Sequence, residues 1–371
     1  LVNVYIGELF RDEVVTSEKY MLSDLQEYFI PEDGDLKFYK DFIQSLPQTD
    51  HPAAFGQHSN SDMAASIDDA ITLLDTLTSL QPKAVSAGDD DAANPLVQQC
   101  RDLLEITPYP WSKRDVRSKL DPRSDPDPLK TVLYQEIDRY NKLLGIMRYS
   151  LQTIIKISDG TASSTSELEE VSVALSTLKV PRTWGKTYPS LKPLGSWMVD
   201  LSQRIEFFTM WIDSRLPACW WLPAMTYPTG FLTAILQVAA RANGVSIDTL
   251  SYDNPVLTTS DATTITDYPK DGVYVSGMYL EGATWNFPGG FLEESRPMEL
   301  VSNMPILQFK PVEGKKKNPK GFYTCPLYMY PVRSGTRERP SYVYSVDIRA
   351  GRFSSDFWTK RGVAMLLATG N

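Results

Sequence analysis

Several residues on which active sites depend are scarce in this chain of 371 residues. It has two histidines, and its three cysteines (Cys100, Cys219, Cys325) are far apart. The sequence has no HExxH, CxxC or GxSxG pattern and no Asn-x-Ser/Thr site, which favours a reducing intracellular compartment. No apolar run approaches the length of a membrane span, and no secretory signal begins the chain. The first residue is not Met, which indicates a piece of a longer protein.

Charge is distributed unevenly along the chain, although the net charge is only −9. Residues 1–100 hold 5 basic and 18 acidic residues, whereas residues 301–371 hold 12 basic and 4 acidic ones. This asymmetry indicates two differently solvated surfaces, ends that contact each other, or a basic end that meets an acidic partner. A nucleic-acid partner is not expected, because the basic residues are scattered without a recognition helix.

The two histidines, His51 and His58, lie in one early loop. No cysteine or third histidine is close to them, so the pair does not predict a metal site. A Ser-His-Asp or Cys-His nucleophile would have to recruit one of these two residues across a domain boundary. We therefore expect no catalytic, cofactor-binding or metal-binding residue in this chain.

One segment resembles part of a phosphate-binding loop. Gly185-Lys186-Thr187 matches the end of the P-loop pattern, which requires a glycine five residues before Gly185, where the chain has Val180. Tyr188-Pro189 then interrupts the helix that would hold the phosphate. Gly289-Gly290 is expected in a turn between strands, without a flanking helix. No nucleotide site is predicted.

Runs of like charge have simple interpretations. The carboxylates Glu293-Glu294 and Asp89–Asp91 fall in turn-rich segments and are expected to be solvated. The lysines Lys315–Lys317 and Lys320 lie between two predicted strands, where they indicate a charged hairpin tip or a contact with an acidic surface. Four tryptophans are expected in the core rather than in a ligand platform: Trp197, Trp211, Trp220 and Trp221.

Helical spacing of apolar residues predicts a mainly helical first part. One helix should follow the loop 46–52, with Asn60 or Ser61 as its cap. Its apolar stripe consists of Met63, Ile67, Ile71, Leu74 and Leu77. Prolines make residues 108–128 irregular, and the longest helix should then bury Leu144, whereas the polar Asn141 should tolerate Ala. Further helices are expected with a capping box at Ser164-x-x-Glu167, at about 194–212, and from 228 to Asn243-Gly244. The longest apolar stripe consists of Leu133, Ile137, Tyr140, Leu144, Met147, Leu151 and Ile154.

The last part of the chain has the pattern of strands. Short runs rich in Val, Tyr and Ile, separated by Gly, Pro and Asp, begin at residue 272 and recur until residue 367. Helices first and strands last predict an α+β fold that ends in a small antiparallel β-barrel or a sandwich.

Several motifs, in order along the chain, closely resemble dynein heavy chains. The C-terminal domain of that family is resembled by VPRTWGKTYPSLKPLGSW at 180–197, WLP at 221–223, YPTGFLT at 227–233, SIDTL at 246–250, DGVYV at 271–275, LEGATW at 280–285, CPLY at 325–328 and WxxRGVA at 358–364. Upstream, FGQHxN at 55–60 resembles the helical lid of the sixth AAA+ module of the same family.

This resemblance implies three parts: a lid at 1–83, the helical part of the C-terminal domain at 84–245, and its β-barrel part at 246–371. It also implies a non-catalytic segment that braces the ring of an ATP-driven, minus-end-directed microtubule motor. ATP and Mg²⁺ would bind in upstream AAA+ modules, and the microtubule at an upstream stalk. Partners would be the rest of the ring and the intermediate and light chains, without nucleic acid or membrane. The variant at 280–285 favours an axonemal chain, placed in the cytoplasm and cytoskeleton of a cilium or flagellum.

A second hypothesis is a stand-alone helical and β-barrel module that binds a protein segment or a sugar. Its sign would be an exposed groove lined by Tyr323, Tyr328, Tyr330 or Tyr342. A third hypothesis, a hydrolase, requires a nucleophile and a base, for which the sequence offers no obvious histidine.

Overall fold

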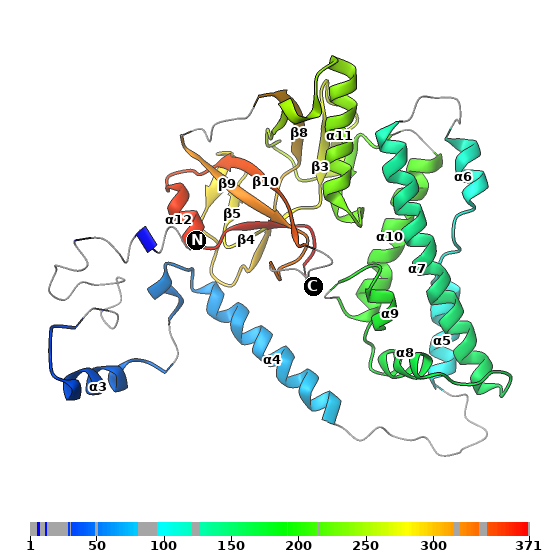
Figure 1. Ribbon diagram of the computed structural model, residues 1–371, viewed down its shortest axis with the longest axis horizontal. Coiled ribbons are helices and arrows are strands. Elements are labelled where there is room, and N and C mark those ends of the chain that lie inside the picture. Colours follow the sequence, from blue (N-terminus) through cyan, green and yellow to red (C-terminus); the bar gives the residue numbers. More distant parts are fainter. Residues whose placement is uncertain are drawn as a thin grey trace.

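The computed structural model describes residues 31–48, 51–80, 95–120, 127–190, 192–213, 216–314, 320–333 and 340–369, together with the isolated residues 6, 7, 12 and 29. Helices dominate the first part and strands the last, which confirms the predicted α+β class (Figure 1). The helices of at least one full α-turn are α3 (Leu36–Ser45), α4 (Asn60–Leu80), α5 (Pro95–Ile106), α6 (Lys113–Lys119), α7 (Pro128–Ser158), α8 (Ser166–Ser176), α9 (Arg182–Gly185), α10 (Leu194–Asp213), α11 (Pro228–Asn243) and α12 (Ser355–Lys360).

Among the residues that the structure describes, the strands form three open sheets. They are β1 (Cys219–Trp221), β2 (Leu250–Asp253), β3 (Val273–Ser276), β4 (Tyr279–Glu281), β5 (Thr284–Asn286), β6 (Phe291–Glu293), β7 (Val301–Asn303), β8 (Leu307–Glu313), β9 (Phe322–Tyr328), β10 (Tyr342–Arg349) and β11 (Ala364–Leu366). Their orders are β1-β3-β8-β2, β10-β9-β11-β4-β7 and β5-β6.

The closed antiparallel barrel expected from the sequence is not confirmed among the described strands. Each sheet has two edges, and two pairs, β1–β3 and β9–β11, are parallel. Neither parallel pair is joined by a short turn, because parallel strands need a longer crossover connection. A helix, α11, lies between β1 and β3 in sequence, and α12 precedes β11. Strand β1 precedes α11 in sequence, yet it pairs with β3. The helical part of the chain therefore contributes one strand to the first sheet.

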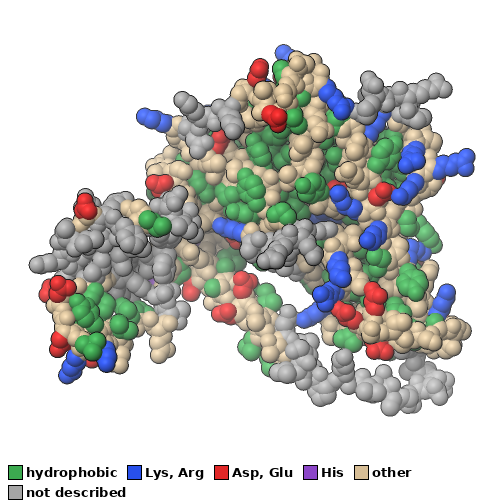
Figure 2. Space-filling model, viewed as in Figure 1, with side chains coloured by type: hydrophobic (Ala, Val, Ile, Leu, Met, Phe, Trp, Pro, Cys, Tyr) green, Lys and Arg blue, Asp and Glu red, His purple; other side chains and the backbone are tan. Residues whose placement is uncertain are grey.

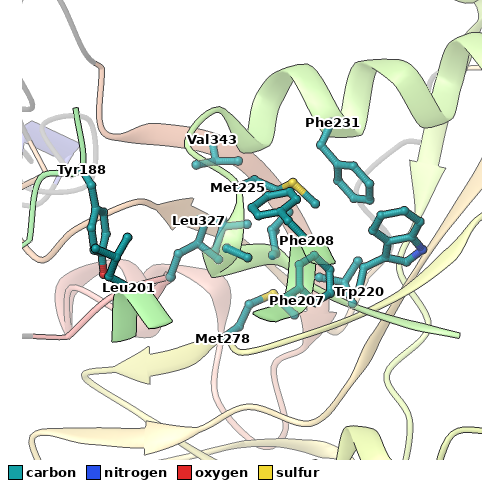
Figure 3. Close-up of a cluster of buried hydrophobic side chains, with 14 of the residues drawn as sticks. Tyr188, Leu201, Phe207, Phe208, Trp220, Met225, Phe231, Met278, Leu327 and Val343 are labelled. Carbon is teal, nitrogen blue, oxygen red and sulfur yellow. The ribbon is translucent and has the colours of Figure 1, made fainter. Parts of the chain in front are cut away.

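A single core joins the helices to the sheets (Figure 3). Phe208 of α10 and Phe231 of α11 are fully buried, and Trp220 of β1 lies between the two helices. The ring of Trp220 lies 4.8 Å from that of Phe231 and 4.7 Å from that of Trp211. The tryptophans predicted as core residues are therefore core residues, although Trp221 is only partly buried.

Helix α7 confirms the longest predicted stripe, which is buried along its whole length. Its main helical neighbours are α5 and α11, and α8 also contacts it. The cap of α8 is corrected by one residue: the Thr165 hydroxyl, not Ser164, accepts the Leu168 N–H. The proline-rich stretch 108–128 is less irregular than predicted, because α6 fits between Pro110 and Pro122, capped by Ser112.

Helix α4 stands apart from the core. We call β1 and the described residues from 246 to 369 the strand-rich half. Figure 1 shows α4 leaving this half and running away from it, with no other described helix packed along its length. Its predicted apolar stripe is exposed, as at Ile67 and Ile71. None of the described helices is long and apolar enough to cross a membrane. The acidic run Asp89–Asp91 and the lysines Lys315–Lys317 lie outside the described residues.

Candidate functional site: a polar clamp and an asparagine lock

The two histidines act as local caps. His51 Nδ1 accepts the Ala53 N–H at 3.2 Å, and His58 Nδ1 accepts the Asn60 N–H at 3.1 Å. Among the residues that the structure describes, no three His, Cys, Asp or Glu side chains gather where they would hold a metal ion. The prediction that the chain has no catalytic or cofactor-binding residue remains a prediction.

The segment that resembles a P-loop is a packed turn. Gly185 ends the one-turn helix α9, whose Trp184 is fully buried and donates its indole N–H to Ser150 of α7 at 3.3 Å. Tyr188 follows and stacks on Trp197, with ring centroids 5.2 Å apart. Gly289-Gly290 lies in the turn between β5 and β6, as predicted.

Two predictions about polar residues need correction. Glu294 is not simply solvated, because its carboxylate pairs with Arg361 at 2.7 Å and with Arg352 at 3.9 Å. Tyr323 cannot line a groove, because it is buried and its hydroxyl donates to the Val363 carbonyl at 2.7 Å. Lys320 is exposed.

The polar groups that the structure does bring together surround the loop 222–227, between β1 and α11. On one side lies Glu136, a fully buried carboxylate in α7. Its two oxygens accept the backbone N–H groups of Thr226, at 2.9 Å, and Tyr227, at 3.2 Å. Arg139, one turn along α7, donates from Nη1 to Glu136 at 2.9 Å and to the Thr226 hydroxyl at 3.1 Å. The charge of the buried carboxylate is thus compensated, as burial requires.

On the other side of the loop, α10 contributes a buried ion pair. Arg204 Nε donates to Asp200 at 2.8 Å, and Arg204 Nη1 donates to the Pro223 carbonyl. The guanidinium also lies over the Tyr188 ring, 4.3 Å from its centroid. Tyr140 of α7 completes the set by donating its hydroxyl to the Ala224 carbonyl at 2.8 Å. We call Glu136, Arg139, Tyr140, Asp200 and Arg204 the polar clamp.

Burial and neighbouring groups shift the pKa of Tyr140 and Arg204 in the clamp. Desolvation raises the pKa of Tyr140 above its ordinary range, with the nearby Arg204 acting in the opposite sense. Burial works to lower the pKa of Arg204, but Tyr140 and Asp200 outweigh it and raise that pKa. Lys192, near Asp200 at 3.5 Å, has its pKa lowered by desolvation and by Arg204. The phenol therefore stays a donor and the guanidinium stays charged.

The loop 222–227 has little regular secondary structure, and the clamp supplies hydrogen-bond partners for its backbone. Backbone groups of residues 223, 224, 226 and 227 are paired with side chains of α7 and α10, and not with another strand. Because unpaired buried backbone groups cost free energy, these bonds fix where β1 ends and α11 begins. The clamp thus joins two helices of the helical half to a strand of the first sheet.

A second junction ties the N-terminal segment to the strand-rich half. Asn60, the first residue of α4, is buried. Its Nδ2 donates to the carbonyls of Arg296, at 2.8 Å, and Glu299, at 3.0 Å, and its Oδ1 accepts the Met298 N–H at 3.0 Å. Met298 has a φ of 68°, a left-handed conformation that non-glycine residues seldom adopt. We call Asn60 and the turn 296–299 the asparagine lock.

The contact extends into the loop before α4. Gly56 has a φ of 71°, and a Cβ there would lie 3.2 Å from side-chain atoms of Lys360 at the end of α12. The predicted cap Asn60 therefore has another role, since its side chain bonds a turn more than 230 residues away. The acidic end thus hydrogen-bonds to the turn 296–299, which lies before the basic end, and packs closely beside Lys360 of the basic end.

Sequence reasoning missed the clamp residues, although a signal was present. Glu136 lies on the buried face of α7 beside the apolar stripe, and Asp200 and Arg204 share the buried face of α10 with Trp197 and Leu201. Charged residues at core positions of a helix indicate a buried polar network. The lock carried no such signal, because its partners are backbone groups.

Comparison with known proteins covers almost the whole chain. Residues 67–367 match the C-terminal domain of dynein heavy chains, and residues 1–61 match the AAA lid domain of dynein heavy chains. The chain belongs to the dynein heavy chain family. The clamp lies within the C-terminal domain of this family, and the lock joins that domain to the last residues of the lid.

Individual dynein heavy chains are similar over nearly the full length of the segment. The dynein-1-beta heavy chain of the flagellar inner arm I1 complex of Chlamydomonas reinhardtii is 44% identical over 368 residues, 98% of this chain. Dynein axonemal heavy chain 2 of Mus musculus is 43% identical over 371 residues, and dynein axonemal heavy chain 1 of Homo sapiens is 35% identical over 368. The chain spans only 8%, 8% and 9% of the lengths of these three relatives.

Proposed function

We propose that this segment is a non-catalytic brace in the motor ring of an axonemal dynein, which drives ciliary or flagellar motility. The named relatives support the axonemal assignment and a place in the cytoskeleton of cilia or flagella. ATP and Mg²⁺ would bind in upstream AAA+ modules, and the microtubule at an upstream stalk. The ring itself and the intermediate and light chains would be the partners.

The observation that carries the proposal is the pair of junctions. The lock joins the lid to the strand-rich half, and the clamp joins that half to the long helices α7 and α10. A force applied to the lid is therefore transmitted through hydrogen bonds and a single core to the whole segment. Such a connected element can bias two arrangements of a ring if it contacts them differently.

Exposed apolar surface on α3 and α4 supports packing against the rest of the motor. No residue of α3 is buried, although Leu36 and Ile43 are large and apolar, and Figure 2 shows such side chains on its surface. On α4, Ile71 and Leu77 are also exposed. Contiguous apolar surface of this kind marks an interaction site. Because relatives are more than ten times longer than this chain, we assign that surface to upstream parts of the ring.

The finer description of the strand-rich half as a small barrel is part of this proposal. The two larger sheets share one core, which supports a single β unit that moves as one body. A stand-alone module that binds protein or sugar is not favoured as the main function, because the family match runs through the chain from residue 1 to residue 367.

The test uses the complete heavy chain with Asn60→Ala. Basal ATPase should stay within about twofold of the wild type, because the nucleotide sites lie elsewhere. Stimulation by microtubules should fall by about threefold or more, since couplings are typically worth ~1–3 kcal/mol. Asn303→Ala, at an exposed asparagine of β7, is the matched control. If the lock variant and the control have equal stimulation and equal gliding velocity, the bracing role is wrong.

A further inference from the structure

A groove lies where the helical half meets the second sheet, next to the polar clamp. Its volume is about 370 Å³. One wall is the start of α11, from Thr226 to Thr229, and the other is formed by Met329, Tyr330 and the first residues of β10. Helix α11 and strand β10, which both supply lining residues, contact each other.

Aromatic and proline side chains dominate the lining. Tyr227, Tyr330 and Tyr342 line the groove, together with Pro228 and Pro340. Tyr227 is 52% exposed and Tyr342 is 49% exposed. Tyr342 is held by an edge-to-face contact with Tyr328, with ring centroids 6.0 Å apart, and by a hydrogen bond of 2.9 Å between its hydroxyl and that of Ser345. Exposed, fixed tyrosines of this kind are typical of interfaces.

The polar side chains of the lining are hydroxyls, which both donate and accept hydrogen bonds, and one guanidinium, which only donates. They are the hydroxyls of the tyrosines, Thr226 and Thr229, and the guanidinium of Arg139. Arg139 uses Nη1 for Glu136 and Thr226, and a guanidinium carries further N–H groups on Nε and Nη2. Arg139 is the one ionised side chain among the described lining residues, and the buried Glu136 already compensates its charge. A ligand that offers acceptors and no net charge therefore complements the groove.

We propose that this groove binds a proline-rich segment of a partner protein in the polyproline II conformation. Such a segment has carbonyl acceptors but few N–H donors, and its backbone makes no internal hydrogen bonds. Its pyrrolidine rings pack on aromatic faces, and because it is already extended it loses little entropy on binding. The tyrosines would contact the prolines, and the hydroxyls and Arg139 would donate to the carbonyls.

Binding in this groove would be a function in addition to bracing the ring, and the groove proposal does not depend on the bracing proposal. A bound segment would contact α7 through Arg139, α11 through Tyr227 and β10 through Tyr342. Occupancy would thus bridge the two halves that the clamp already joins.

The experiment is a titration of fluorescein-labelled decaproline with the 371-residue chain, followed by fluorescence anisotropy. We expect saturable binding, and binding at least about tenfold weaker for a glycine-serine decamer and a glutamate decamer. Tyr342→Ala and Tyr227→Ala should each weaken the decaproline affinity at least about fivefold, because aromatic anchors dominate such interfaces. Tyr149→Ala is the matched control, because Tyr149 is 66% exposed on α7 but does not line this groove.

Thermal melts of each variant show whether it has folded, and Tyr342→Phe, which keeps the ring, should retain most of the affinity if Tyr342→Ala proves unstable. The proposal is overturned if decaproline shows no saturable binding up to about millimolar concentration. Equal affinity for the glycine-serine decamer, or equal losses in the Tyr149 and Tyr342 variants, also overturns it. So does saturable binding of an oligosaccharide, such as chitohexaose, when decaproline does not bind.

Discussion

Helices α7 and α4 carry similar apolar stripes, but the stripe of α7 is buried and that of α4 is exposed. In α7 the stripe is buried, with Leu133, Leu144 and Leu151 fully inaccessible. In α4 the corresponding residues lie on the surface, with Ile71 53% and Leu77 52% exposed. The same periodicity therefore predicts a helix in both places but does not predict what covers it. The difference shows that contacts within this segment cover the apolar face of α7, whereas the apolar face of α4 is exposed in the described structure.

The two helices are also held by different kinds of polar contact. Helix α7 supplies Glu136, Arg139 and Tyr140 to a buried network that contains charges. Helix α4 is tied to the strand-rich half at its first residue, Asn60, by neutral hydrogen bonds to backbone groups. Loss of a partner in a buried charged network costs more than loss of a neutral bond.

The largest effect is expected in the middle of α7. Leu144→Asp places a carboxylate in a site with no exposure, and Arg148, four residues along the helix, already donates to the carbonyls of Leu104 and Thr107. The cost of several kcal/mol is a large part of a typical stability of ~5–15 kcal/mol. The variant should therefore lose its cooperative thermal transition, as followed by circular dichroism. A melting temperature close to that of the wild type would show that α7 does not pack as described.

The next effect is expected in the clamp. Arg204→Met leaves Asp200 buried with only Lys192 near it, at 3.5 Å, and should cost about 3–5 kcal/mol in denaturant unfolding. The double variant Asp200→Leu/Arg204→Met removes the stranded charge and should recover more than half of that loss. If the double variant is as unstable as the single one, the ion pair is not the source of the effect.

A smaller loss is expected at Asn141, which the sequence suggested would tolerate Ala. Its side chain accepts the Trp111 N–H at 2.7 Å and donates to the Trp111 carbonyl at 2.9 Å. Asn141→Ala should therefore cost about 1–3 kcal/mol in denaturant unfolding, because two backbone groups lose their partner. Lys142→Ala, at the exposed neighbouring position, should stay within about 0.5 kcal/mol. If the two variants are equally stable, the expectation from the sequence that Asn141 tolerates Ala is correct.

The smallest effect is expected on α4, and it sharpens the comparison with α7. Ile71→Ser in the 371-residue chain should change the free energy of unfolding by no more than about 0.5 kcal/mol, because the side chain is already exposed. In the complete heavy chain the same change should lower the melting temperature of the motor measurably. A large loss in the short chain would mean that this face of α4 is buried there.

Sequence reasoning predicted the elements of this fold better than their connections. Spacing predicted α7, α10 and α11, and the end of α11 at Asn243-Gly244, because local apolar pattern and cap residues determine these features. The strand runs were also found, but not the sheet order or the parallel pairs, which depend on contacts between distant segments. Short strands such as β1 and β2 were missed because three or four residues carry little periodic signal.

The candidate site was predicted only in part, for the same reason. Of these two junctions, the quoted family motifs contain Asn60 of the lock, together with Pro223 and Tyr227, whose backbone groups the clamp binds, but the motifs did not show which groups meet. Asn60 was interpreted as a helix cap because Asn is favoured there. Its actual partners are backbone groups of residues 296–299, and nothing in the side chains of that turn indicates the contact.

The central claim is that the asparagine lock holds α4 in a fixed position relative to the strand-rich half. Spin labels at Asp69→Cys in α4 and Arg349→Cys in β10 would measure this directly by pulsed electron-electron resonance, since both positions are exposed. The account predicts one narrow distance distribution in the otherwise wild-type chain, a broad one after Asn60→Ala, and no change after Asn303→Ala. A distribution that is equally broad with and without Asn60 would contradict it.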